Sequence, residues 1–276
     1  MLNLENILPS PWGKYHLRKE EVERLTIGSL RLSLTCAAGD ILVGHQYFGT
    51  SANTPYDLLN HTEESNTDET LQWRRWAVEQ HSPVVRLSPC LPDRPVVAQP
   101  EKLLNLPGNH STEVFVSVPI WIAVLMDTNP AAPLLELPSV LLSKTWFGGF
   151  TEGELCYWVT TRMRQEVDYK SSYPFLATCP VMIINRSADD LKIEKVCLQN
   201  QYLTLFWERD RLWTDEMELV YRGDAAASQI EASGAPPTAA PQALLVSPPR
   251  EVLKKGLVGR SFAALTDLPG VGVLFS

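Results

Sequence analysis

The chain has 276 residues, of which 45% are hydrophobic and 20% are charged, and its mean hydropathy is −0.09. This composition is typical of a globular protein with one large domain or two small ones, and it excludes a collagen-like, coiled-coil or wholly disordered chain. The formal net charge of −8 repels polyanions, so no nucleic-acid partner is expected.

Alternation of apolar and polar residues, the pattern of half-buried β-strands, begins in the N-terminal part of the chain. Leucine and isoleucine alternate at 25–27 and again at 30–34, but the phase changes at Gly28 and Ser29, which predicts a tight turn or a bulge there. In the run 114–126 every even position is apolar. Pro119 lies within this run and removes one ladder donor, so we expect the strand at a sheet edge or with a bulge.

The same alternation continues at 154–164, and from 181 to 221 short apolar runs are separated by polar turn clusters. A turn about every ten residues is typical of an antiparallel sandwich or barrel. The best helix candidates, 19–25 and 251–257, are short. We therefore predict a mainly β fold with an antiparallel β-sandwich architecture and few short helices, forming either one sandwich or two packed β lobes.

Changes of composition predict four parts of the chain. We expect an N-terminal β lobe at 12–107 and a C-terminal β-sandwich lobe at 110–222. The segment 223–250 is rich in Ala, Pro and Ser and is predicted as a flexible loop, because so few large apolar residues cannot offset its ordering entropy. The segment 251–276 becomes apolar again and is expected to return to the sheet.

Cysteine usage and the N-terminal residues indicate a cytoplasmic protein. The five cysteines are widely separated and form no CxxC pair, which favours reduced thiols over a disulfide framework or a zinc knuckle. Residues 1–12 lack the basic and apolar regions of a secretory signal. The longest apolar run, 114–126, is shorter than the roughly 20 residues that a membrane-spanning helix needs. No transmembrane segment is therefore expected.

Known catalytic and metal-binding motifs do not match this sequence. The string nearest to the G-x-S-x-G motif of α/β hydrolases is 259–263, and it ends in Ala instead of Gly. These enzymes also need a histidine after the serine in the chain, and no histidine follows His110. The histidines form neither HxH nor HExxH. Glycines at 146–150 and 256–261 lack the spacing of a phosphate-binding loop. We expect no enzyme activity, cofactor or metal site, although the acidic segment 61–70 leaves cation binding open.

Three features are candidates for an interaction surface, and ordinary packing is the alternative for each. The turn at 146–150 places large rings around a glycine pair, and such rings either anchor a partner or fold back onto the core. The strand 154–164 places a tryptophan and two arginines on one face, where guanidinium groups can bind a carboxylate or phosphate. The segment 73–76 alternates basic and aromatic residues. The candidate residues are Trp146, Phe147, Phe150, Trp158, Arg162, Arg164, Trp73 and Arg74.

Four segments between 118 and 218 carry a family resemblance: 118–124, 141–163, 181–198 and 201–207. The features that match are Val118-Pro119-Ile120, Lys144, Phe147-Gly148, Gly153, Leu155, Tyr157-Trp158 and Asn185. They resemble DUF432, a prokaryotic family of unknown function, mainly over the central and C-terminal strands. The resemblance implies a loose association with genes for small-conductance mechanosensitive channels, and it carries over no catalytic residue.

The preferred hypothesis from the sequence is a non-enzymatic cytoplasmic binding or accessory protein that acts through protein–protein contacts. Its expected partner is a membrane channel of the mechanosensitive type. One alternative is a β-sandwich that binds a small ligand or carbohydrate, since eight tryptophans offer rings for stacking. A second alternative is a hydrolase whose convergent site has no local motif. The oligomeric state is left open by the sequence.

Overall fold

The computed structural model describes residues 8–37, 39–48, 71–78, 82–151, 153–161, 163–169, 172–223, 228–253, 258–259 and 261–263. In these residues the chain forms strands β1 to β23 and one short 3₁₀ helix, η4 (Asn200–Tyr202). The prediction of a mainly β fold built largely from antiparallel strands is confirmed. Among the described residues, no helix has the length and apolar character that crossing a bilayer requires.

The chain divides into two compact units. Unit 1 comprises Met1–Cys90 and Pro119–Leu141, and unit 2 comprises Leu91–Val118 and Leu142–Ser276. The chain therefore enters unit 2, returns to unit 1 for two strands, and then completes unit 2.

Local patterning places the two lobes at 12–107 and 110–222, whereas the contacts assign 91–107 to unit 2 and 119–141 to unit 1. The reason lies in strand pairing between distant parts of the sequence. β7 and β8, which lie within 91–107, pair with β16 and β15 of unit 2, while β10 pairs with β6 of unit 1.

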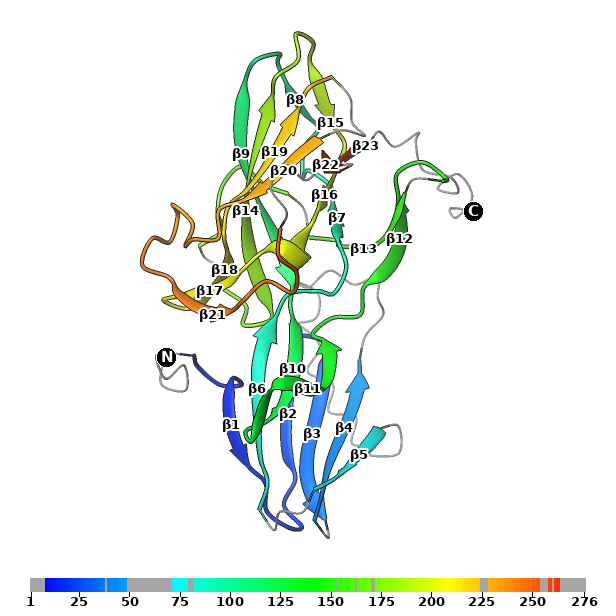
Figure 1. Cartoon of the computed structure of the whole chain (residues 1–276), viewed down its shortest axis with the longest axis vertical. Helices are drawn as coiled ribbons and strands as arrows, with labels where there is room; N and C mark the ends of the chain where they lie inside the picture. The colour runs from blue at the N-terminus through cyan, green and yellow to red at the C-terminus, as the bar shows by residue number, and fades with distance from the viewer. Residues whose placement is uncertain are drawn as a thin grey trace. The chain divides into compact units, whose positions relative to one another are not determined.

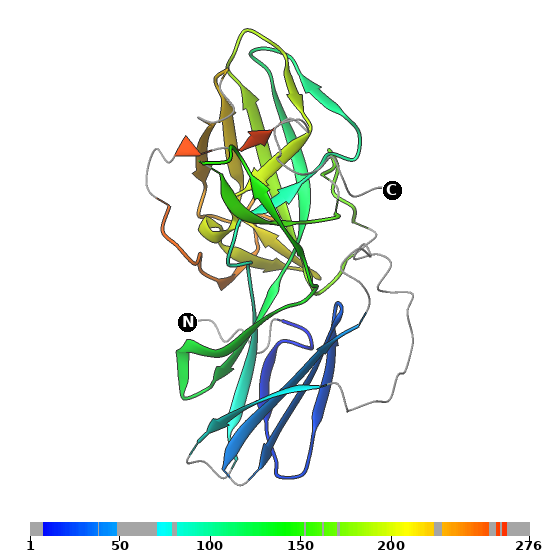
Figure 2. The ribbon, with the colours of Figure 1, turned by 90° about the vertical axis from the view of Figure 1, so that its right-hand side faces the viewer.

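Unit 1 consists of two four-stranded antiparallel sheets (Figures 1 and 2). The first sheet contains, in order, β1 (Gly13–His16), β6 (Val84–Cys90), β10 (Trp121–Met126) and β11 (Asn129–Pro138). The second contains β2 (Glu23–Ile27), β3 (Leu30–Ala37), β4 (Asp40–Tyr47) and β5 (Gln72–Ala77). Both sheets contribute buried aliphatic side chains, and the Tyr47 hydroxyl joins them by donating to the carbonyl oxygen of Pro138 at 2.9 Å.

The predicted change of phase between β2 and β3 is a tight turn at Gly28 and Ser29. Gly28 has a φ of +64°, and a side chain there would collide with the backbone of Ser139. The N–H of Ser29 donates to the carbonyl oxygen of Ser139 at 2.9 Å. Glycine therefore satisfies both the backbone conformation of this turn and its close approach to the neighbouring sheet.

Unit 2 contains two larger sheets and one pair of strands. The five-stranded sheet contains, in order, β12 (Ser143–Phe147), β13 (Glu154–Trp158), β7 (Val96–Ala98), β16 (Lys195–Leu198) and β23 (Phe262–Ala263). The eight-stranded sheet contains β21 (Leu244–Ser247), β17 (Leu205–Glu208), β18 (Arg211–Thr214), β14 (Leu176–Asn185), β19 (Met217–Tyr221), β20 (Ser228–Ala232) and β22 (Val258–Gly259), and β9 (Ser111–Pro119) also pairs with β14. β15 (Leu191–Ile193) pairs with β8 (Leu104–Leu106). β14 is almost wholly buried along its length, as expected for a strand covered on both faces.

The alternating run 114–126 contains the end of one strand and the start of another. β9 ends at Pro119 and belongs to unit 2, while β10 begins at Trp121 and pairs with β6 and β11 in unit 1. The prediction of one strand with a bulge or an edge position is therefore wrong. Pro119 has no N–H to donate, which suits the end of a ladder.

Within the predicted flexible loop 223–250, residues 224–227 lie outside the described residues, and the part from 228 to 250 contains regular structure, which corrects the prediction for that part. β20 pairs with β19, and β21 pairs with β17. Between these strands, Ala240 and Ala243 are buried against Phe206 and Trp213. Small side chains are therefore ordered here because large aromatic rings from other strands supply the apolar surface that the segment itself lacks.

Two further predictions concern the ends of the described regions. A helix at 19–25 is wrong, because β2 begins at Glu23 and pairs with β3. A helix at 251–257 is not formed at 251–253, and 254–257 lie outside the described residues. β22 pairs with β20, and β23 pairs with β16, so this part of the C-terminal segment returns to the sheets of unit 2 as predicted. Residues 264–276 lie outside the described residues.

Candidate functional site

An exposed apolar surface lies on the hairpin of β12 and β13, at one end of the five-stranded sheet of unit 2. It consists of Trp146, Phe150 and Leu155, which we call the hairpin patch. Trp146 and Leu155 are cross-strand partners, so their side chains lie on the same face of the hairpin. Phe150 lies in the loop that connects the two strands, and its side chain is 85% exposed.

The loop of this hairpin is built around the indole ring of Trp146. The indole Nε1 donates to the carbonyl oxygen of Gly149 at 3.0 Å, so the polar atom of the ring is satisfied within the hairpin. The N–H of Gly153 donates to the same carbonyl at 2.8 Å, and any side chain at Gly153 would collide with the indole. The exposed indole is thus held in place by its own hairpin.

Phe147, the third aromatic residue predicted for this surface, points to the opposite face and is buried. It packs with Val97, Cys156 and Cys197 in a small core cluster. Its assignment to the interaction surface is therefore wrong. The reason is strand alternation, which turns Trp146 outward and its neighbour Phe147 inward.

The inward face of the same sheet carries a group of thiol, carboxyl and amide side chains, which we call the thiol cluster: Glu154, Cys156, Cys197 and Gln199. The Sγ atoms of Cys156 and Cys197 lie 3.7 Å apart, and Sγ of Cys197 lies 3.9 Å from Oε1 of Glu154. Nε2 of Gln199 donates to Oε1 of Glu154 at 2.5 Å. One ligand atom from each of Glu154, Cys156 and Cys197 lies within 4.8 Å of the others, which is close enough to share one metal ion.

Burial governs the protonation of this cluster. It raises the pKa of the Cys197 thiol well above its usual value, and the neighbouring Cys156 adds to the shift. Burial also raises the pKa of the Glu154 carboxyl, while hydrogen bonds from Gln199 and Cys197 act in the opposite direction. The side chains of Cys156 and Cys197 are fully buried, and these two cysteines form no disulfide.

Sequence reasoning missed the thiol cluster, although each half has a recognisable spacing. Glu154 and Cys156 are two residues apart on β13, and Cys197 and Gln199 are two residues apart at the end of β16. Such pairs share one face of a strand. The two pairs are about forty residues apart in the chain, so only the fold brings them together.

The arginine-bearing face predicted for 154–164 does not form as one strand. β13 ends at Trp158, whose half-buried ring lies 5.2 Å from the Lys195 ammonium group. Arg162 lies outside the described residues. Arg164 instead forms backbone hydrogen bonds with Phe115 and enters a separate groove. The prediction of one continuous recognition face is therefore wrong, because β13 ends at Trp158 and Arg164 pairs with Phe115 of β9 instead of extending that strand.

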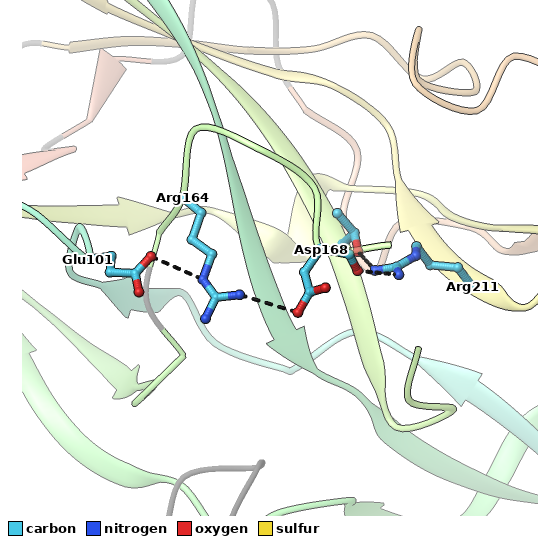
Figure 3. Close-up of polar contacts among 5 residues, drawn as sticks. Glu101, Arg164, Asp168 and Arg211 are labelled. Atoms are coloured by element: carbon cyan, nitrogen blue, oxygen red, sulfur yellow. Dashed lines mark hydrogen bonds and ion pairs between the residues drawn. The ribbon is translucent and has the colours of Figure 1, made fainter. Parts of the chain in front are cut away.

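This groove of unit 2 has a volume of about 870 Å³, and its lining includes Glu101, Leu103, Arg164, Asp168 and Tyr169. Arg164 lies between two carboxylates: Nε is 3.3 Å from Glu101, and Nη1 is 3.4 Å from Asp168 (Figure 3). The guanidinium charge is therefore balanced within the groove. Tyr169 exposes 67% of its surface there.

Arg211 holds one end of the groove in place (Figure 3). Its Nη2 donates to the backbone oxygen of Asp168 at 2.6 Å, and Nη1 donates to Oγ1 of Thr178 at 3.2 Å. The guanidinium carbon also lies 5.8 Å from the centre of the Tyr169 ring. Arg211 of β18 therefore contacts both the exposed tyrosine ring and the backbone of Asp168.

The basic and aromatic cluster predicted at 73–76 lies on β5 in unit 1. Trp73 is exposed, and its ring lies over Gly44 on β4, where a side chain would be in tight contact with the indole. Arg74 is also exposed, and Arg75 forms an ion pair with Asp40. The acidic segment 61–70, the other predicted candidate, lies outside the described residues.

Comparison with known proteins identifies the family of the chain. No curated protein and no solved structure matches it. The family model described as a protein of unknown function, DUF432, matches residues 11–267, which is nearly the whole chain. The chain therefore belongs to the DUF432 family.

Proposed function

We propose that this chain is a non-enzymatic, cytoplasmic binding protein that holds a partner protein through the hairpin patch. The observation that carries the proposal is the exposure of Phe150, together with the partly exposed Trp146 and Leu155 beside it. Exposed clusters of large apolar residues are a common property of protein-binding surfaces, and aromatic residues are frequent anchors in them.

The occupant that fits this surface best is an extended segment of the partner. β12 is the last strand of its sheet and pairs on one side with β13, and its other edge pairs with no strand in the described part of unit 2. An open edge can accept a partner strand through backbone hydrogen bonds, while neighbouring apolar side chains supply specificity. Lys144 is exposed on β12 and favours acidic residues in that segment.

The proposed partner is the cytoplasmic part of a mechanosensitive-type membrane channel. The support for this choice is the association that the family resemblance implies. In this arrangement an extended cytoplasmic segment of the channel would pair with the open edge of β12.

Binding to such a channel is the direct test. The full chain and the purified channel from the same cell are mixed, and the dissociation constant is measured by surface plasmon resonance. We expect Phe150→Ser to weaken binding by about thirtyfold, the effect of losing about 2 kcal/mol at an aromatic anchor. Val252→Ser, which changes an exposed apolar residue of the same unit, is the control and is expected to bind as the wild type does.

Two results would contradict this proposal. One is the absence of saturable binding between the wild-type chain and the channel. The other is equal affinity of Phe150→Ser and the wild type, which would place the contact elsewhere on the chain.

The groove of unit 2 supports a second candidate function, the binding of a small neutral ligand such as an oligosaccharide. An exposed tyrosine ring beside carboxylate acceptors offers stacking and hydrogen bonds to hydroxyl groups, and the balanced charge of Arg164 disfavours a strongly charged ligand. The hydrolase alternative has less support, since the residues described as lining this groove include no histidine, serine or cysteine.

Titration calorimetry with a panel of neutral oligosaccharides tests the groove. We expect Tyr169→Ala to weaken binding of any sugar that the wild type holds by about fivefold, since an aromatic contact contributes about 1 kcal/mol. Phe150→Ala is the control, because it removes an exposed ring outside the groove. If no sugar in the panel binds, or if both variants lose affinity equally, this second function is rejected.

A further inference from the structure

We infer that Glu154, Cys156 and Cys197 form a binding site for one zinc ion. The three residues come from β13 and β16 of the five-stranded sheet, and their ligand atoms lie within 4.8 Å of one another. Two sulfur atoms bound to one tetrahedral zinc at about 2.3 Å are roughly 3.8 Å apart. The two Sγ atoms are 3.7 Å apart, so little movement is needed to place an ion between them.

The charge of Glu154 is the second argument for a cation at this position. Its carboxyl group is partly buried, and its hydrogen bonds come from the Gln199 amide and the Cys197 thiol, both of which are neutral. In the part of the chain that the structure describes, no lysine, arginine or histidine forms an ion pair with it. A carboxylate withdrawn from water without a cation is costly, and a divalent ion would remove that cost.

The ligand types select the metal. Two thiolates and one carboxylate oxygen suit zinc, whereas magnesium and calcium prefer sites made only of oxygen ligands. Binding exchanges the two thiol protons, which are released to solvent, for the ion. Three protein ligands leave a fourth position for a water molecule.

Gln199 acts as a positioning residue for this site. Its Nε2 donates to Oε1 of Glu154, while its own Oε1 accepts from Nε2 of Gln201 at 2.8 Å. This chain of two amides fixes the orientation of the carboxylate that faces the thiols. Outer residues that orient metal ligands commonly change metal affinity by about tenfold to a hundredfold.

Metal binding is tested on the full-length protein after removal of bound metal with a chelator under reducing conditions. Titration with zinc sulfate, followed by competition with a chromogenic chelator, gives the stoichiometry and affinity. Titration with cobalt(II) chloride reports thiolate ligation through its charge-transfer absorption. We expect one ion per chain and a cobalt spectrum typical of tetrahedral coordination with two thiolates.

Four variants locate the ion. Cys156→Ala and Cys197→Ala are each expected to weaken zinc binding by at least about a hundredfold, since each removes a direct ligand, and Gln199→Ala by about tenfold. Cys179→Ala is the matched control, because Cys179 is also fully buried in unit 2 but lies on β14 outside the cluster, and its affinity is expected to equal that of the wild type. Circular dichroism verifies that each variant is folded.

Three results would overturn the inference. The first is a wild-type protein that takes up no zinc and gives no cobalt charge-transfer band. The second is unchanged metal binding when both Cys156 and Cys197 are replaced by alanine. The third is a disulfide between these two cysteines in the protein as isolated, found by mass spectrometry, with no zinc bound after reduction. The wild-type cobalt spectrum decides the question even if the cysteine variants do not fold.

Discussion

Replacing Asn185 with alanine is expected to lower the free energy of unfolding by about 3–5 kcal/mol, because several buried hydrogen bonds lose their partner at once. The side chain is fully buried at the end of β14. The two hydrogens on its Nδ2 are shared among the carbonyl oxygens of Leu106, Pro107 and Asp189, which lie 3.0, 3.1 and 2.8 Å from the nitrogen. Its Oδ1 accepts from the backbone N–H and the hydroxyl of Ser187 at 3.0 and 2.7 Å.

The reason for so large an effect is that Asn185 joins two parts of unit 2. Its contacts tie the turn after β14 to the end of β8, a strand of three residues that pairs only briefly with β15. Alanine would leave the carbonyl groups of Leu106 and Pro107 without this donor. Asn185 is also one of the residues that carry the resemblance to DUF432, and these contacts give a structural reason for asparagine at this position.

Urea unfolding followed by circular dichroism measures this effect. Asn185→Asp is expected to be at least as destabilising as the alanine variant, since a carboxylate oxygen would face carbonyl oxygens where an amide now donates. Ser187→Ala removes one hydroxyl from the same network and is expected to cost about 1 kcal/mol. A loss of less than 1 kcal/mol in Asn185→Ala would contradict the role assigned to this side chain.

The fold class follows from local chemistry more readily than the division into units does. Alternation predicts strands, and the change of phase at Gly28 and Ser29 predicts the turn that the structure has. Alternation cannot tell which strands pair. The run 114–126 has one unbroken pattern, yet β9 and β10 belong to different units, because the pairing partners of each strand are distant in the sequence.

Amino-acid composition predicts less well whether a segment is ordered when that segment packs against apolar side chains from other parts of the chain. The segment 223–250 has few large apolar residues, which is the reason for predicting a flexible loop. Its alanines at 240 and 243 are nonetheless buried against Phe206 and Trp213. The rings that order the segment are provided by β17 and β18, so no property of the segment alone could reveal this packing.

The candidate sites show the same division between local and distant information. Exposure of Trp146 and Phe150 is compatible with the predicted aromatic turn, and local alternation contains the information that Phe147 points the other way. The thiol cluster depends on two strands that flank β7, and the groove around Arg164 depends on carboxylates from separate segments. No spacing rule joins residues so far apart in the chain.

Replacing Phe147 with alanine is expected to lower the free energy of unfolding by about 3–5 kcal/mol, through lost burial and the cavity left behind. The ring is 1% exposed and packs with Val97, Cys156 and Cys197, with Trp158 at the edge of the cluster. These neighbours belong to three strands of one sheet. Their backbones are fixed by strand pairing, so they can close only part of the cavity.

Phe150→Ala provides the matched comparison, since it removes the same side chain three residues away from a position that is 85% exposed. Its expected change in unfolding free energy is within about 0.5 kcal/mol. Urea unfolding of both variants thus separates the two phenylalanines of one predicted surface into a core residue and a binding residue. Equal destabilisation by the two substitutions would contradict this arrangement of the hairpin. A stable Phe150→Ala protein would also show that any loss of partner binding by a Phe150 variant reflects the hairpin patch itself, because the fold beneath it is intact.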